Sequence, residues 1–386
     1  MQKNMQDKKL SRNGTQVQAS TAELHLLVCL LTKNAVGAAR GLEASPELIN
    51  KLAETCGRSG LSVALLRALE GSPLRSRLNP RQVELLNEAR QLQKQRQQAL
   101  EPALLHLAEL FESRKQPFIL LKGPYLASRF YGNTMGREYV DIDLLVPSAD
   151  RSNACAIIEA AGFRRYSGIL LSEDLTGFFV HAFDFRTGQV SVDLHWNLSR
   201  HPSLRIDEKQ LWAQRVSFRL EGRSYDVLSD EHEVLFAALS LLRDIERGRP
   251  KLKNVIDSIM IAEAVDARID WDGLLSSRDG TAGPLAHVLR LCLEITDARN
   301  LVPNLAAALN RHGRSCVPIM ACAADSPLQF RPSFFSLGNK LWAARAYDTG
   351  MAAWLFWWAL SLPFRLAVHK KPPLQSRQRM RPGACG

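Results

Sequence analysis

A short apolar segment that carries two aspartates constrains the fold of this 386-residue chain more than any other feature of its sequence. The segment, residues 139–146, has the sequence YVDIDLLV, which is typical of a buried strand. Side chains alternate between the two faces of a strand, so Asp141 and Asp143 lie on the same face. Two adjacent carboxylates repel each other and are costly to bury, so the pair indicates a solvated edge or a bound cation. The apolar end of the segment favours the core, and therefore a divalent cation such as Mg²⁺.

A second predicted strand, residues 189–196, carries a third carboxylate. It forms a hairpin with residues 181–185, with Thr187-Gly188 as the predicted turn. Its apolar side chains face one way, and Ser191, Asp193 and His195 share the opposite, polar face. If this strand and the first are neighbours in one sheet, the three aspartates converge as a two-metal phosphoryl-transfer site requires.

The residues that precede the aspartate pair supply groups that suit a phosphate. A short strand, residues 118–121, is predicted to end at Lys122-Gly123, and a helix is predicted over residues 124–131. The small size of Gly123 lets a phosphate approach the backbone near the helix N-terminus. Lys122 offers a positive point charge at the same turn, and Arg137 is placed to pair with either a phosphate or the aspartates.

These motifs resemble the uncharacterised nucleotidyltransferase family of the DNA-polymerase-beta nucleotidyltransferase superfamily, in which a glycine turn precedes a D-x-D strand and a later strand supplies a third acid. The matching residues are Leu121-Lys122-Gly123, Tyr131, Arg137, residues 141–146 and residues 192–196. The resemblance, which covers residues 115–200, implies that Asp141 and Asp143 are catalytic metal ligands. It implies that Asp193 is a shared metal ligand or the base that helps to deprotonate an attacking hydroxyl, and that Gly123 belongs to the phosphate-binding turn. It also implies Mg²⁺ as the cofactor, with Mn²⁺ as the alternative.

Helical periodicity on both sides of these motifs completes the predicted fold. The fold class is α+β, with a nucleotidyltransferase-fold core, a small mixed sheet with flanking helices, between all-helical segments. Capping boxes are predicted at Ser20 and Asp230, and Pro102 is predicted to kink or restart the helix that begins at Asn79-Pro80. The predicted divisions are a disordered basic N-terminal tail (1–17), an N-terminal helical segment (18–112), the core (113–226), a C-terminal helical domain (227–345), an aromatic amphipathic helix (346–364) and a disordered basic tail (365–386).

The net charge of +11 is concentrated at the two ends of the chain. Residues 1–17 carry +3 and residues 365–386 carry +6, which leaves +2 for everything between them. The body therefore offers no strong nucleic-acid surface, whereas residues 350–386 suit a weak peripheral membrane contact. The uncharged stretch 350–364 is too short to span a bilayer.

Composition restricts the class of protein further. With 46 % hydrophobic and 23 % charged residues, the chain is neither wholly disordered, nor collagen-like, nor a polytopic membrane protein. Seven scattered cysteines without a C-x-x-C pair argue against a disulfide framework or a cysteine zinc site, and fit a reducing compartment. The polar start lacks the apolar region of a secretory signal, so the expected location is cytoplasmic.

The expected function is that of an enzyme, a Mg²⁺-dependent nucleotidyltransferase that transfers a nucleoside monophosphate from an NTP to a hydroxyl or phosphate acceptor. The expected acceptor is a small molecule or peptide, and the family resemblance suggests a biosynthetic role. Lys122, Gly123, Arg137 and His195 are predicted to bind substrate or phosphate, and whether His195 is catalytic or only hydrogen-bonded stays open. The NTP and an unknown acceptor are the predicted partners, and no oligomeric state is indicated.

Two alternatives to this function stay open. Pro124 lacks the N–H that would bind a phosphate, which suits a weakly active or inactive nucleotide-binding or partner-binding protein that keeps the fold. The basic tails suit a peripheral membrane or nucleic-acid-associated protein.

Overall fold

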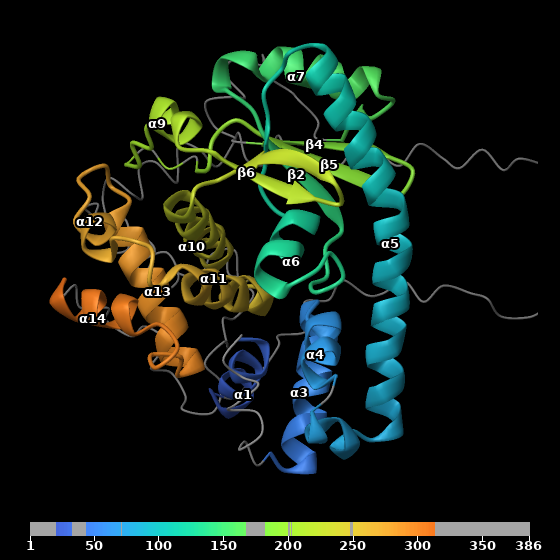
Figure 1. Ribbon diagram of the computed structural model, residues 1–386, viewed down its shortest axis with the longest axis vertical. Helices are drawn as coiled ribbons and strands as arrows, with labels where there is room; N and C mark the ends of the chain where they lie inside the picture. The colour runs from blue at the N-terminus through green and yellow to red at the C-terminus, as the bar shows by residue number, and fades with distance from the viewer. Residues whose placement is uncertain are drawn as a thin grey trace, which may run out of the picture.

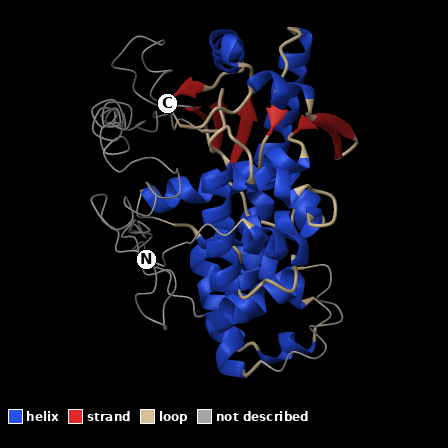
Figure 2. Cartoon of the chain, turned by 90° about the vertical axis from the view of Figure 1, so that its left-hand side faces the viewer, coloured by secondary structure: helices blue, strands red, loops and turns tan. Residues whose placement is uncertain are grey.

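The computed structural model describes residues 21–32, 44–70, 72–166, 182–199, 201, 203–247 and 250–312. The predictions for the two basic tails, for the aromatic segment 346–364 and for the cap at Ser20 lie outside the described residues. The fold is α+β, as predicted. Most helices fill one part of the molecule, and the strands gather in the other part with further helices on their outer side (Figure 2).

The described N-terminal segment forms helices whose ends follow local chemistry. They are α1 (Thr21–Leu31), α3 (Pro46–Ser59), α4 (Ser62–Leu69), the short 3₁₀ helix η1 (Pro73–Arg77) and α5 (Pro80–Ser113). The side chain of Ser45 caps α3 and that of Asn79 caps α5, each directly before a proline at the first helical position. Gly60, with a φ of 69°, ends α3.

Helix α5 continues through Pro102, so the prediction of a restart there is wrong. A proline inside a helix removes one backbone donor, and its ring crowds the carbonyl four residues earlier. Leu100 and Leu104 on either side of it are 3 % exposed, and this burial stabilises one continuous helix across the proline. The helix extends from the N-terminal helices along the side of the molecule to the sheet (Figure 1).

Five strands form a mixed sheet in the order β1-β2-β5-β4-β3. They are β1 (Ile119–Leu120), β2 (Asp141–Leu145), β3 (Arg164–Arg165), β4 (Ala182–Thr187) and β5 (Val190–His195). β2 and β5 run parallel, and the other neighbouring pairs are antiparallel. A separate hairpin of β6 (Val216–Leu220) and β7 (Arg223–Val227) was not expected from the sequence.

The hairpin of β4 and β5 is present, but its turn lies one residue later than predicted. Thr187 pairs with Val190 and is therefore the last strand residue. The turn residues are Gly188 and Gln189, and Gly188 has a φ of 53°, which glycine adopts without strain.

The two faces of the five-stranded sheet differ in polarity. The apolar face carries residues that belong to the main core, namely Ile142, Leu144, Phe183, Phe185, Val192 and Leu194. Helices α5 and α7 (Arg151–Ala160), the latter preceded by the 3₁₀ helix η2 (Ser148–Asp150), pack on this side. The opposite face carries the aspartates and is closed at one end by a smaller apolar cluster that includes Leu145 and Phe236.

The remaining helices surround the polar face and the N-terminal helices. They are α6 (Pro124–Tyr131), α9 (Glu208–Ala213), α10 (Asp230–Glu246), α11 (Leu252–Val265), α12 (Trp271–Leu275), α13 (Ala282–Thr296) and α14 (Pro303–Arg311). α1 packs against both α4 and α13, so helices from before and after the sheet in the sequence form one packed region (Figure 1). Among the described residues, no helix combines the length and the hydrophobicity that a membrane span requires.

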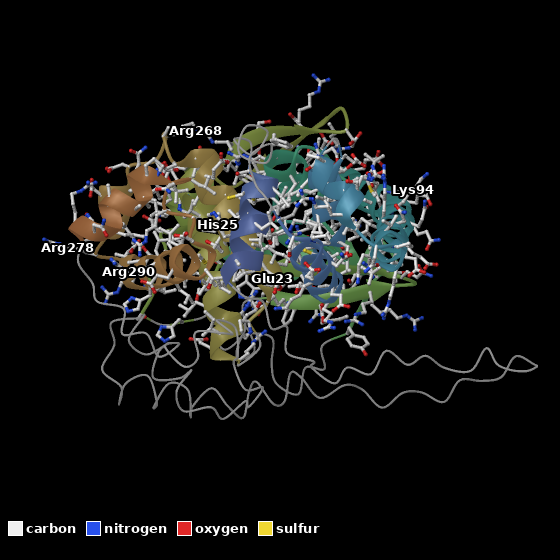
Figure 3. The ribbon with its side chains drawn as sticks, turned by 90° about the horizontal axis from the view of Figure 1, so that it is seen from below. Glu23, His25, Lys94, Arg268, Arg278 and Arg290 are labelled. Atoms are coloured by element: carbon white, nitrogen blue, oxygen red, sulfur yellow. The ribbon has the colours of Figure 1, made fainter. Side chains whose placement is uncertain are left out.

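Glu23 and Glu233, the acidic partners in the capping boxes predicted at Ser20 and Asp230, are both buried. The cap of α10 is Ser229, whose side chain accepts from the His232 N–H, so the predicted cap at Asp230 is wrong; the Asp230 carboxylate instead binds arginine side chains. Glu23 of α1 lies in the helical region (Figure 3). Its carboxylate lies 2.7 Å from Lys51 Nζ.

Candidate functional site

The carboxylates of β2 and β5 meet because these two strands are parallel neighbours. Asp143 pairs with Asp193, and Asp141 pairs with Ser191 two positions away. Residues paired across neighbouring strands lie on the same face of a sheet. The condition set by the sequence, that the two aspartate-bearing strands be neighbours, is therefore met.

The tightest group on this face consists of Asp143, Asp193 and His195. One potential ligand atom from each of them lies within 4.8 Å of the other two. The Nε2 atom of His195 is 3.2 Å from Asp143 Oδ1, within hydrogen-bond distance. His195 is only 3 % exposed. Asp141 is outside this group and half-buried at the start of β2.

Burial and neighbouring charges move the pKa values of these groups in different directions. Burial, followed by repulsion from Asp143, raises the pKa of Asp141 to about 6. Burial also acts to raise the pKa of Asp143, but the hydrogen bond and charge of His195, with help from Lys122, lower that pKa to about 2. Burial lowers the pKa of His195 itself. At neutral pH the group therefore presents an ionised Asp143 beside a neutral imidazole.

A fourth carboxylate, which sequence reasoning missed, belongs to the same face. Asp184 of β4 pairs in register with Asp193. Burial and then a hydrogen bond with Asp184 raise the pKa of Asp193 well above its ordinary value, and repulsion from Asp143 and Asp141 adds to this. The alternation of Asp184 with Phe183 and Phe185 was a signal that could have found it.

The turn at Gly123 requires glycine for two reasons. Its φ of 69° and ψ of −128° are a conformation that L side chains rarely adopt. A Cβ atom at this position would stand 3.2 Å from the backbone oxygen of Asp141. The Leu121 N–H also donates to the backbone carbonyl oxygen of Asp143 at 3.0 Å, so the predicted phosphate turn lies directly against β2.

Lys122 points from this turn toward α10. Its Nζ donates to Ser240 Oγ at 2.9 Å and lies 4.5 Å from the centre of the Phe236 ring. Burial lowers the pKa of Lys122, and the nearby charge of Asp143 acts against that shift. Lys122 is therefore a half-buried cation held between the turn, α10 and Asp143.

Arg137 pairs with Asp257 of α11, a partner that the sequence did not indicate. Its Nε and Nη2 donate to the two carboxylate oxygens at 2.7 and 2.6 Å, and Tyr131 Oη donates to Oδ1 at 2.7 Å. Both ion-pair side chains are almost fully buried. The Arg137–Asp257 ion pair links the loop that precedes β2 to α11, so Arg137 positions this loop.

Lys253 brings a second half-buried cation from α11 to the outer end of β2. Its Nζ donates to the Glu138 carbonyl at 3.1 Å. Burial lowers the pKa of Lys253 to about 8, and its charge is the strongest of those that favour the ionised form of Asp141. Lys253 and Asp257 are four residues apart on one helix face, a spacing that would have indicated a shared contact.

The helix α10 also contributes residues that sequence reasoning missed. Phe236, Ser240 and Arg243 recur at helical spacing, and Arg243 lies close enough to favour the ionised form of Asp143. The signal was a serine within the apolar run 234–242 and an arginine directly after it, both at helical spacing from Phe236.

A carboxylate-bearing pair of parallel strands beside a glycine turn, in a small mixed sheet between helices, defines the class of protein as nucleotidyltransferase-like. The chain belongs to the family of uncharacterised nucleotidyltransferases, whose model matches residues 45–298. Among solved structures, the chain is similar to an antigenic nucleotidyltransferase-like protein from Paracoccidioides brasiliensis, with 15 % sequence identity and a TM-score of 0.33; the match covers 54 % of this chain and 91 % of that one. No curated protein matches the chain.

The residues on the polar face suit a divalent cation. Carboxylate oxygens and a neutral imidazole nitrogen are common ligands for such ions. The raised pKa of Asp193 shows that burial and its carboxylate neighbours disfavour its ionised form. A cation between Asp143 and Asp193 would offset this repulsion, so the donor set and its charge both fit a bound metal.

Proposed function

We propose that this chain is a metal-dependent nucleotidyltransferase that transfers a nucleoside monophosphate from an NTP to a hydroxyl or phosphate acceptor. The observation that carries the proposal is the register of β2 and β5, which pairs Asp143 with Asp193 beside His195 and next to the Gly123 turn. Membership of the nucleotidyltransferase family supports the reaction class.

In the proposed reaction, the acceptor oxygen forms a bond to the α-phosphorus and gives up its proton, and the bond to the bridging oxygen of pyrophosphate breaks. Asp143 and Asp193 would hold the divalent cation, with Asp141 at the outer end of the same strand. A bound cation would stabilise the negative charge that develops on the α-phosphoryl and leaving oxygens. Asp193 is also the candidate base for the acceptor proton.

The Gly123 turn and the Lys122 side chain would place the triphosphate. The Gly123 turn lies against β2 and precedes the N-terminus of α6, where backbone dipoles favour an anion. Lys122, beside Asp143, adds positive charge on the same side of the site. These groups are preorganised by hydrogen bonds to β2 and α10, which limits the reorganisation that binding would require.

The test uses NTPs labelled at the α-phosphate or at the γ-phosphate, incubated with the full-length protein, Mg²⁺ or Mn²⁺ and fractionated cell extracts. Label should enter an acceptor from the α-labelled NTP only, and Asp143→Asn should abolish this transfer. Asp272→Asn, which removes an exposed carboxylate of α12, is the control and should behave as wild type. Equal labelling by wild type and Asp143→Asn would refute the proposal.

A second candidate function is nucleotide binding without turnover, and Pro124 is the observation that favours it. Pro124 occupies the first position of α6 and has no N–H for a phosphate oxygen. Under this alternative, calorimetry would detect NTP binding that Gly123→Ala weakens, while no acceptor receives label from any NTP.

A further inference from the structure

His195 stands among the carboxylates of the polar face, where the sequence predicted a substrate or phosphate contact and left open whether this histidine is catalytic or only hydrogen-bonded. It follows Asp193 by two residues on β5, so both side chains point to the same face. The register places Asp143 beside Asp193 on the neighbouring strand. The imidazole therefore stands diagonally across from Asp143.

The nitrogen that faces this group is Nε2. It lies 3.2 Å from Asp143 Oδ1. The ring is held by burial and by an edge-to-face contact with Phe236, with centroids 6.1 Å apart and an interplanar angle of 84°. The orientation of Nε2 toward the carboxylates is thus built into the packing and needs no rearrangement.

The three potential ligand atoms are close enough to share one ion. Atoms that are no more than 4.8 Å from one another all lie within about 2.8 Å of a common point. Small side-chain movements would bring them to the bonding distances of a divalent cation. Asp141, the other aspartate of the D-x-D pattern, is outside this group and lies near the Lys253 charge instead.

We propose that Nε2 of His195 is a direct ligand of the metal together with Asp143 and Asp193, and that the site prefers Mn²⁺ or another first-row divalent cation to Mg²⁺. The inference rests on the metal-dependent function proposed above and names the ligand set and the metal class of that same site.

The donor chemistry gives the reason for this preference. Mg²⁺ favours oxygen ligands, whereas an imidazole nitrogen bonds first-row transition ions better. A neutral imidazole carries a single proton, so Nε2 either donates that proton to Asp143 or binds the metal with the proton on Nδ1. Metal binding therefore replaces the His195–Asp143 hydrogen bond with two bonds to the same cation.

Pulsed electron paramagnetic resonance of the Mn²⁺-loaded, full-length protein tests the ligand directly, with and without α,β-methylene-ATP, which blocks transfer at the α-phosphorus. A coordinated imidazole produces a ¹⁴N coupling to Mn²⁺. The expected result is a ¹⁴N signal in wild type that is lost when all histidines are labelled with ¹⁵N. This isotope comparison needs no variant, so it does not depend on how well a variant folds.

Two variants identify the residue. His195→Gln should lose the coupling, whereas His106→Gln, which removes an exposed histidine of α5, should keep it. Loss of an outer-shell partner typically weakens metal binding 10–100-fold, so loss of this ligand should weaken Mn²⁺ binding by at least about tenfold, and Mg²⁺ binding by less. Circular dichroism of both variants checks that they are folded.

The outcomes separate this inference from the proposed function. Mn²⁺ that binds without any histidine coupling would overturn the inference, since His195 would then act only through its hydrogen bond to Asp143, and the metal-dependent function would stand. If neither Mn²⁺ nor Mg²⁺ bound to wild type, with or without the nucleotide, both the inference and the metal-dependent function would be wrong.

Discussion

Replacement of Asp257 by asparagine should destabilise the protein by about 3–5 kcal/mol, because it leaves a buried guanidinium without its counter-charge. Arg137 is 3 % exposed and donates to both oxygens of Asp257, at 2.7 and 2.6 Å, while Tyr131 donates to one of them at 2.7 Å. Asparagine keeps the shape of the side chain but presents an amide NH₂ to one of these donors. The loss is therefore one of charge and hydrogen bonding rather than of packing.

The free energy of unfolding is measured by urea denaturation followed by circular dichroism, with refolding checked. Asp272→Asn is a matched control, because Arg311 holds Asp272 with the same two-point geometry, through Nε at 3.1 Å and Nη2 at 2.7 Å. In that pair the arginine and aspartate side chains are 56 % and 50 % exposed, and water screens the interaction. The control should leave the urea midpoint almost unchanged.

The effect of Asp257→Asn should also depend on pH. Burial acts to raise the pKa of Asp257, but the Arg137 guanidinium outweighs it and lowers that pKa. A lowered carboxyl pKa contributes stability above the unfolded value of about 3.9, and this stability is lost as the pH falls through the folded pKa. The difference between wild type and variant should be full at pH 7 and shrink in acid. Equal effects of Asp257→Asn and Asp272→Asn at pH 7 would refute this account of the pair.

Two other substitutions test the turn and the packing of α10. Gly123→Ala should lower the free energy of unfolding by about 1–3 kcal/mol through backbone strain, and it should impair NTP-dependent labelling because its Cβ would press on β2. The control is Gly222→Ala, which is also at positive φ but in open space, and which should lose less stability and leave labelling intact. Similar losses of stability for both variants would contradict the close approach of Gly123 to β2. Burial raises the pKa of Glu233 to about 8, so the folded state of wild type loses stability as the pH rises from about 4 toward 8. Glu233→Gln lacks this loss, so its free energy of unfolding should rise relative to that of wild type by up to about 4 kcal/mol between pH 5 and pH 8. Its melting temperature should rise relative to that of wild type over the same range. A difference in stability that is constant with pH would contradict the raised pKa of Glu233.

Local pattern was enough to predict the elements that carry the site. Strand alternation placed Asp141 with Asp143 and Asp193 with His195, and proline after glycine predicted α6 from its first residue to its last. These features depend on residues that are neighbours in the sequence, so no knowledge of the tertiary fold was needed.

Some local features still escaped prediction. Ser229 and Asp230 are both good caps, and nothing in the sequence says which hydroxyl or carboxylate receives the first N–H groups. β6 has exposed or half-exposed residues at four of its five positions, so it lacks the alternation of a half-buried strand. Pro102 is tolerated inside α5 because core contacts on both sides of it outweigh the missing hydrogen bond and the crowding of its ring against the preceding turn.

The sequence by itself determined which residue types share a strand face and where the glycine turn lies. It also determined that each aspartate-bearing strand has an apolar face opposite its acidic one. Only the tertiary structure decided that β2 and β5 are parallel neighbours in the register that joins Asp143, Asp193 and His195, and that Arg137 belongs to Asp257. The physical reason is that these contacts join residues far apart in the chain. Which strands pair, and which buried charges meet, follows from how the helices and the sheet pack together, and the local sequence pattern does not contain that information.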